Sequence, residues 1–284
     1  MSRGVFLRTV CIFLLLCLLV SCHRATAPEP APNESSVSEE QEETVLQLKD
    51  IGVNTLDAWF RAFPPMGGET QWKDGRSAKE LARYFTASLP YVPAELAELL
   101  GQISQKQAVF DWLAEMETDF SAHGLGFGEG RNHDAALWNG EIFVGVEAKA
   151  DEPFGNLYLN EEYEAASQNK KGRIEGLSEM VFGKKMPDGS AHLRYQLLTA
   201  TGAVLLEAKE RGLSKALFVV VEFHCEGNYS PEKAQQNEND LLSFLLEVGA
   251  DYNPKGNYYV LPTPYGEAHG ITLYFQKIII DLPS

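Results

Sequence analysis

Cysteine is scarce in this sequence of 284 residues, which has four, too few for a disulfide scaffold. Basic residues are also in deficit, with 24 Lys and Arg against 40 Asp and Glu and a formal net charge of −16. This balance excludes polycationic proteins that wrap nucleic acid, because those neutralise phosphates with an excess of Lys and Arg. What remains, 44% hydrophobic and 23% charged residues, is ordinary globular composition.

The first 22 residues predict an export signal. Arg3 and Arg8 form a positive start, and an unbroken apolar run covers 10–20. Those eleven residues are too few to span a bilayer as a helix, which needs about 20. Leu19-Val20-Ser21-Cys22 then resembles the lipobox of bacterial lipoproteins, in which the signal is cut before a lipidated cysteine. The resemblance implies a signal peptide over 1–21, lipid on Cys22, and an extracytoplasmic protein anchored in the bacterial cell envelope; a plain secretory signal is the alternative.

Residues 22–43 predict a tether that carries the lipidated cysteine. The segment is rich in Pro and Ser, holds six acidic residues, and lacks the apolar residues needed to fold. The remaining 44–284 has a net charge of −13, so the predicted domain is itself acidic. After signal cleavage and lipidation only Cys225 stays a thiol, which predicts no disulfide, within the chain or to a partner, and favours a buried structural thiol.

The pattern predicts an α/β fold in one domain, with a helical part over 44–124 followed by a mixed central sheet flanked by helices over 125–284. Helices are expected in 44–63, after a capping box at Ser77 to Glu80, after Pro93, and in 110–120. Strands are expected at 133–138, 141–149, 215–223, 258–262 and 271–280, and helices at 193–211 and 238–248. Asn139-Gly140 is a hairpin dipeptide and joins the first two strands.

This hairpin carries the residues that could do chemistry. Alternation along a strand puts Glu147 and Lys149 on one face. Counting across a turn at 139–140 places Glu147 opposite residue 132, one diagonal step from Asp134. Two carboxylates that close repel unless a cation lies between them, and Mg²⁺ or Mn²⁺ prefers such oxygen ligands. Lys149 could then orient a nucleophilic water or stabilise charge on a phosphate.

An acidic residue, a hairpin and Glu-x-Lys resemble the PD-(D/E)XK nuclease superfamily, which has the restriction-endonuclease-like fold. The resemblance covers roughly 125–225 and makes Asp134, Glu147 and Lys149 the catalytic residues. It also implies the carbonyl of Ala148 as a further metal ligand, and Glu129 and Gln196 as supporting catalytic residues. The sequence departs from the motif at residue 133, where His stands in place of Pro.

Two functions are therefore predicted. The first is a membrane-anchored nuclease that hydrolyses phosphodiester bonds of DNA or RNA with Mg²⁺ or Mn²⁺. The second is an inactive surface lipoprotein that acts as a binding or assembly module, with Glu147 and Lys149 as a solvated ion pair on a strand. Two basic segments, Lys170-Lys171-Gly172-Arg173 and Lys184-Lys185, could touch a nucleic-acid backbone or be ordinary solvated loops. The oligomeric state is not predicted.

Overall fold

Eight strands form one mixed sheet in the computed structural model, which describes residues 46–104, 109–126, 130–225 and 230–282. The strand order is β1-β2-β3-β4-β5-β8-β7-β6. Strands β4, β5 and β8 run parallel to one another, while β2, β3 and β4 are antiparallel neighbours, as are β8, β7 and β6. The strands are β1 (Gln47–Leu48), β2 (Val109–Thr118), β3 (Arg131–Trp138), β4 (Ile142–Lys149), β5 (Lys215–Cys225), β6 (Asp251–Asn253), β7 (Tyr258–Leu261) and β8 (Thr272–Leu282).

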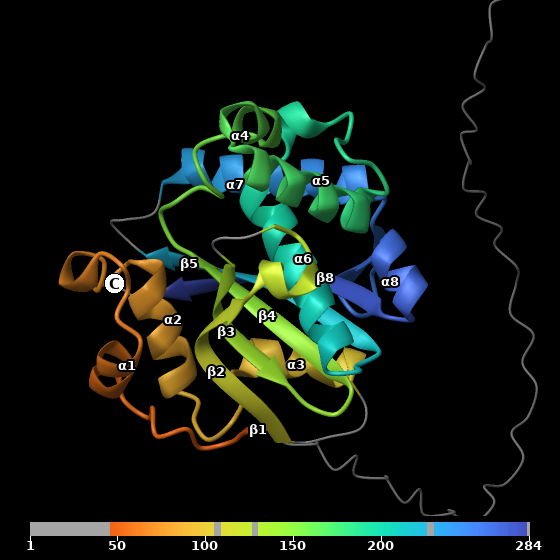
Figure 1. The fold of residues 1–284 in the computed structure, drawn as a ribbon. Helices are drawn as coiled ribbons and strands as arrows, with labels where there is room; N and C mark the ends of the chain where they lie inside the picture. The colour runs from red at the N-terminus through yellow and green to blue at the C-terminus, as the bar shows by residue number, and fades with distance from the viewer. Residues whose placement is uncertain (1–45, 105–108, 127–129, 226–229, 283–284) are drawn as a thin grey trace, which may run out of the picture. The chain divides into compact units, whose positions relative to one another are not determined.

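Helices cover both faces of this sheet (Figure 1). One layer contains α1 (Leu56–Ala62), α2 (Ser77–Thr86) and α3 (Ala94–Ile103). The other contains α4 (Leu159–Ala165), α5 (Gln168–Phe182), α6 (Tyr195–Glu210), α7 (Pro231–Val248) and α8 (Pro264–His269). Each layer has its own apolar core, and β5 contributes Val219 and Val221 to the first and Phe218 and Val220 to the second. The α/β fold with a mixed, helix-flanked sheet is thus confirmed.

The prediction of a helix at 110–120 was wrong, because this segment forms β2. Its exposed and buried residues alternate almost throughout, with Phe110, Trp112 and Ala114 buried, which is the period of a strand. The helix expected across 44–63 is also shorter than predicted: it is confined to α1, and β1 precedes it. The amino-terminal part therefore adds two strands to the sheet. The capping box was wrong as well, since Ser77 is already helical and Glu80 accepts a hydrogen bond from the Gly75 amide.

The hairpin between β3 and β4 exists, but its register differs from the prediction by two residues. Ala136 pairs with Gly145, and Trp138 with Phe143. The turn lies one residue later because the Asn139 side chain accepts hydrogen bonds from the Glu141 and Ile142 amides, at 2.8 and 3.0 Å. A shift of two leaves the side chains of β4 on their predicted faces, with Val144 and Val146 opposite Glu147 and Lys149.

Close packing of α6 against β4 depends on Gly145. A Cβ at this position would lie 2.5 Å from Cγ1 of Val204 and 2.6 Å from Nδ1 of His133. We expect Gly145→Ala to destabilise the fold by about 1–3 kcal/mol through overpacking. Urea unfolding measures this, with Gly101→Ala in α3 as the control, since an added Cβ there meets nothing within 4 Å. A cost equal to that of the control would contradict the packing argument.

Cys225 is buried, as expected, and burial raises the pKa of its thiol. Among the helices of the described ranges, none has the length and apolarity to cross a membrane. The predicted signal, tether and lipidated Cys22 lie outside the described residues.

Candidate functional site

The regular alternation of side chains between the two faces of the sheet is interrupted in β2 and β3 at the same position. This interruption shapes the site. Ala114 and Ala135 pair with each other and pack toward α1–α3. Met116 and His133 also pair with each other, two residues further along the strands, where side chains would normally return to the same face. They pack instead toward α6, on the opposite face. Glu115 lies between them with φ +53°, in the left-handed region that a residue with a side chain rarely adopts. Such outliers cluster at functional sites, so this position directs attention to its partner strand.

Asp134 lies at this change of face. The β3–β4 ladder ends at the pair Ala135 and Val146, and its continuation would place Asp134 opposite Glu147. Beyond the ladder, Oδ2 of Asp134 accepts a hydrogen bond of 2.8 Å from the Ala148 amide. A side-chain carboxylate thus replaces a backbone partner, which fixes Asp134 against the strand that carries the other two predicted residues.

Glu147 is the centre of the polar cluster. Its residue is only 4% exposed, and both carboxylate oxygens are engaged. Oε1 accepts from Nζ of Lys149 at 2.7 Å, and Oε2 accepts from Nη2 of Arg131 at the start of β3. A buried carboxylate needs such cations to offset its loss of hydration. Arg131 was missed by sequence reasoning, although it lies three residues before Asp134, because no motif calls for a cation there.

Lys149 is equally buried, at 4% exposure, and its Nζ lies 5.3 Å from the ring centroid of Phe154. Burial lowers the pKa of Lys149, as does the positive charge of Arg131, whereas the carboxylates of Asp134 and Glu152 act in the opposite direction. The predicted alternative of a solvated Glu147–Lys149 pair is therefore wrong, since neither side chain faces solvent.

The amino terminus of α6 lies at the same end of the sheet. Arg211, near the other end of α6, lies over Phe143 at the beginning of β4, so α6 runs antiparallel to β4. Helical spacing places Gln196 on the face of Val204, which packs on β4. Gln196 thus lies on the face of α6 toward β4, and its Oε1 is buried with no hydrogen-bond partner among the described residues.

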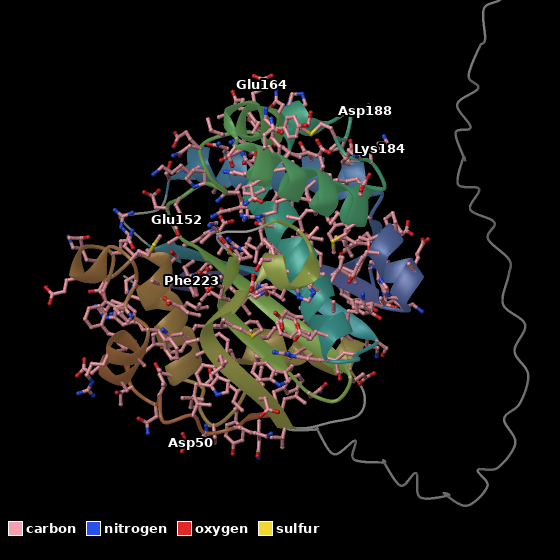
Figure 2. The ribbon with its side chains drawn as sticks, in the orientation of Figure 1. Asp50, Glu152, Glu164, Lys184, Asp188 and Phe223 are labelled. Carbon is pink, nitrogen blue, oxygen red and sulfur yellow. The ribbon has the colours of Figure 1, made fainter. Side chains whose placement is uncertain are left out.

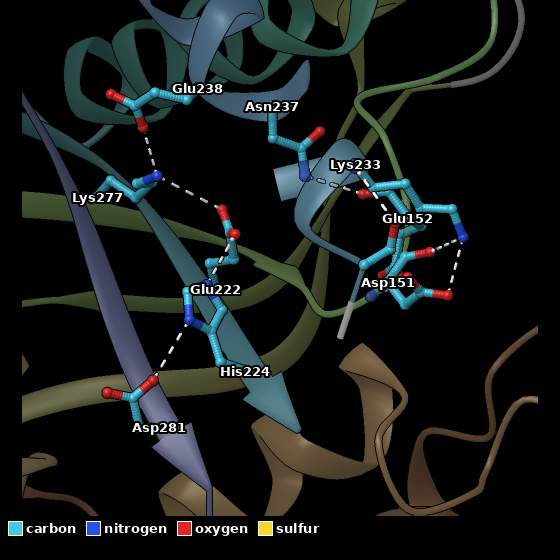
Figure 3. Close-up of polar contacts among 10 residues, drawn as sticks. Asp151, Glu152, Glu222, His224, Lys233, Asn237, Glu238, Lys277 and Asp281 are labelled. Atoms are coloured by element: carbon cyan, nitrogen blue, oxygen red, sulfur yellow. Dashed lines mark hydrogen bonds and ion pairs between the residues drawn. The ribbon is translucent and has the colours of Figure 1, made fainter. Parts of the chain in front are cut away.

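Helix α7 holds the loop that follows β4 (Figure 3). Nζ of Lys233 contacts Oδ2 of Asp151 at 2.8 Å, and Nδ2 of Asn237 donates to the carbonyl of Glu152 at 3.0 Å. These two contacts fix the loop that carries Phe154 over Lys149. Asp151 and the backbone of Glu152 therefore have a structural role in placing this loop.

A second buried carboxylate, Glu222 of β5, lies beside Lys149 in the sheet register and is 1% exposed. Figure 3 shows its partners: Nε2 of His224 at 3.0 Å and Nζ of Lys277 at 3.6 Å. Lys277 also contacts Glu238 of α7 at 2.5 Å. Sequence reasoning missed Glu222, because the apolar pattern of β5 gives no hint that one of its carboxylates is buried.

The structure therefore brings together Asp134, Glu147, Lys149 and the backbone of Ala148, with Gln196 at the adjacent helix end. Glu129 lies outside the described residues. Lys184 lies far from this cluster on the surface of the helical layer, where it contacts Asp188 at 3.0 Å (Figure 2). This exposed ion pair is what an ordinary solvated segment would have, which was one of the two alternatives for Lys184.

The donor set fits a small divalent cation in part. Two carboxylates and a carbonyl are oxygen ligands of the kind that Mg²⁺ and Mn²⁺ bind, with water completing the shell. Against this, both oxygens of Glu147 already bind cationic side chains. No three His, Cys, Asp or Glu side chains in the described ranges converge on one point suited to a metal. An ion would therefore be held by Asp134 and Glu147 alone among side chains, and would displace one of the two cations from Glu147.

His133 gives the region a pH dependence. Burial, aided by the charge of Arg131, lowers the pKa of His133 to about 3. Between that value and the unfolded pKa near 6.5, the unfolded chain binds a proton that the folded chain does not, so stability falls as pH falls. We expect His133→Gln to flatten this slope by about 1.4 kcal/mol per pH unit, measured by urea unfolding in EDTA. Parallel slopes for the two proteins would show that His133 is protonated in the fold.

Comparison with known proteins identifies a family but no activity. A family model matches residues 52–281, and its description is "Domain of unknown function (DUF6946)". A search of curated proteins found no significant match, and a search of solved structures found none.

Proposed function

The chain belongs to the DUF6946 family, and from the geometry of the site we propose a divalent-metal-dependent hydrolase of phosphodiester bonds that acts on DNA or RNA. The observation that carries this proposal is the convergence of Asp134, Glu147 and Lys149 at the point where the β3–β4 ladder ends. Glu147 and Lys149 are buried, and in such a place charges interact strongly. The resemblance to the PD-(D/E)XK superfamily remains part of the proposal.

Each side chain has a distinct task in such a reaction. Asp134, oriented by the Ala148 amide, and Glu147 would hold Mg²⁺ or Mn²⁺ together with the Ala148 carbonyl. When bound, the ion would supply Lewis-acid stabilisation of negative charge. Lys149, kept dry against Phe154, would hold the attacking water or a phosphate oxygen. Gln196 would contribute its amide at the amino terminus of α6.

Hydrolysis of oligonucleotides by the purified full chain tests this proposal. We expect cleavage of DNA or RNA in Mg²⁺ or Mn²⁺ that stops in EDTA and is lost in Asp134→Asn and Lys149→Ala. Both variants must retain the circular dichroism spectrum of the native protein. Cleavage that survives these substitutions would belong to a contaminant or to another site.

A non-catalytic anion-binding module is the second candidate, and one observation favours it. The Glu147 carboxylate is neutralised by Arg131 and Lys149 without any added ion. Oligonucleotide binding that is insensitive to EDTA, with no cleavage, would support this function instead.

We propose that the domain is exported and lipid-anchored through Cys22. The proposal depends on the charged start, the apolar run and the lipobox-like tetrapeptide of the sequence. Labelling of bacterial cells with radioactive palmitate is expected to mark the native chain and not Cys22→Ser. Equal labelling of both proteins would refute a lipid at Cys22.

A further inference from the structure

Arg131 is a buried cation that the proposed chemistry does not yet use. Its side chain is 15% exposed, and its guanidinium contacts Oε2 of Glu147, which is also a proposed metal ligand. Burial lowers the pKa of Arg131, but arginine stays protonated at neutral pH, so a full positive charge faces the place where an ion would bind. The cation and the metal therefore compete for one carboxylate.

The geometry allows Arg131 a second partner. Its Nε is buried and has no hydrogen-bond partner within the described ranges, so the guanidinium fork is only partly satisfied by Glu147. A guanidinium fork matches the geometry of phosphate oxygens, which accept two parallel hydrogen bonds. The amino terminus of α6 lies at the same end of the sheet, and the amino terminus of a helix favours anions.

Charge balance links the two partners. In the metal-free cluster the Arg131 guanidinium is offset by Glu147, while Lys149 also feels the carboxylates of Asp134 and Glu152. A divalent ion bound to Glu147 would displace the guanidinium, and a buried guanidinium without an anion is costly. A phosphodiester group would supply that anion.

We propose that Arg131 exchanges partners: it holds Glu147 in the metal-free protein and binds a substrate phosphate when a divalent ion occupies Glu147. This inference rests on the proposed function and assigns it a substrate-binding residue. Lys149 differs from Arg131 in this respect, because it lies two residues from Glu147 on the same strand and contacts the other carboxylate oxygen, Oε1, at 2.7 Å.

Two affinities measured on the full chain test the exchange. We expect Arg131→Gln to bind Mn²⁺ at least about tenfold more tightly than the native protein, by titration calorimetry, because a competing positive charge is removed. In saturating Ca²⁺ it should bind a fluorescent oligothymidylate at least about tenfold more weakly. Arg131→Lys keeps the charge but not the fork, so it should bind Mn²⁺ nearly as the native protein does and still bind the oligonucleotide weakly.

Arg61→Gln provides the matched control, because it removes the same charge from an exposed position on α1 and should change neither affinity. Thermal unfolding shows whether Arg131→Gln folds. If it does not, Arg131→Lys tests the exchange, and native-like oligonucleotide binding by that variant would overturn it. Unchanged or weaker Mn²⁺ binding in Arg131→Gln, or unchanged oligonucleotide binding, would overturn the exchange alone. Absence of Mn²⁺ binding in both native and variant protein would overturn the metal dependence of the proposed function and the exchange with it.

Discussion

Glu147→Gln is expected to lower the rate of phosphodiester cleavage by about 10³-fold or more, the largest effect on activity that the site predicts. The substitution removes the carboxylate charge that would hold the ion and leaves an amide of nearly the same shape. It also leaves Arg131 and Lys149 without the shared anion that now neutralises both. The measurement is single-turnover cleavage of an oligonucleotide at saturating Mg²⁺.

Glu222→Gln is the matched control for this prediction. Glu222 is a buried carboxylate on the neighbouring strand, beside Lys149 in the register, and it has its own partners in His224 and Lys277. The same chemical change there should leave cleavage within a few-fold of the native rate, after correction for any loss of folded protein. Equal losses in the two variants would mean that burial of charge, rather than metal binding at Glu147, controls activity.

The part of the site that could be predicted was the part fixed by strand periodicity. Alternation alone places Glu147 and Lys149 on one face, and the Asn-Gly dipeptide identifies the hairpin that brings Asp134 near them. The predicted register was off by two residues, because the Asn139 side chain caps the turn one position later than the dipeptide rule implies. That error left Glu147 and Lys149 on their predicted face, since an even shift preserves faces.

Other features could not be predicted because they depend on tertiary contacts. The change of face at Glu115 has no sequence marker, since glutamate is not a residue that favours positive φ. Arg131 gains its role from Glu147 on another strand. The segment at 110–120 was predicted as a helix although its alternation was visible, because the helical context before it outweighed the period-two pattern. In β2 the side chains pack into both apolar cores, Phe110, Trp112 and Ala114 on one face and Met116 on the other, and this packing determines a strand.

Asp240→Ala is expected to destabilise the fold by about 3–5 kcal/mol, the largest effect on stability. Asp240 of α7 accepts a hydrogen bond of 2.7 Å from Nε of Arg194, the residue before α6, and both side chains are about 95% buried or more. Burial raises the pKa of Asp240, and the bond from Arg194 opposes that rise. The Arg194 guanidinium also stacks on Tyr158, 3.9 Å from its ring centroid, so it cannot turn to solvent when its anion is removed.

Urea unfolding checks this value, with Asp188→Ala as the control. Asp188 also pairs with a cation, Lys184, but its side chain is 93% exposed, so its loss should cost no more than about 0.5 kcal/mol. Replacing both partners, as Arg194→Met with Asp240→Leu, should recover much of the loss, because no uncompensated charge then remains buried. A small cost for Asp240→Ala would mean that water reaches Arg194. In that case the start of α6, which positions Tyr195 and Gln196 at the site, would not depend on α7 for its placement.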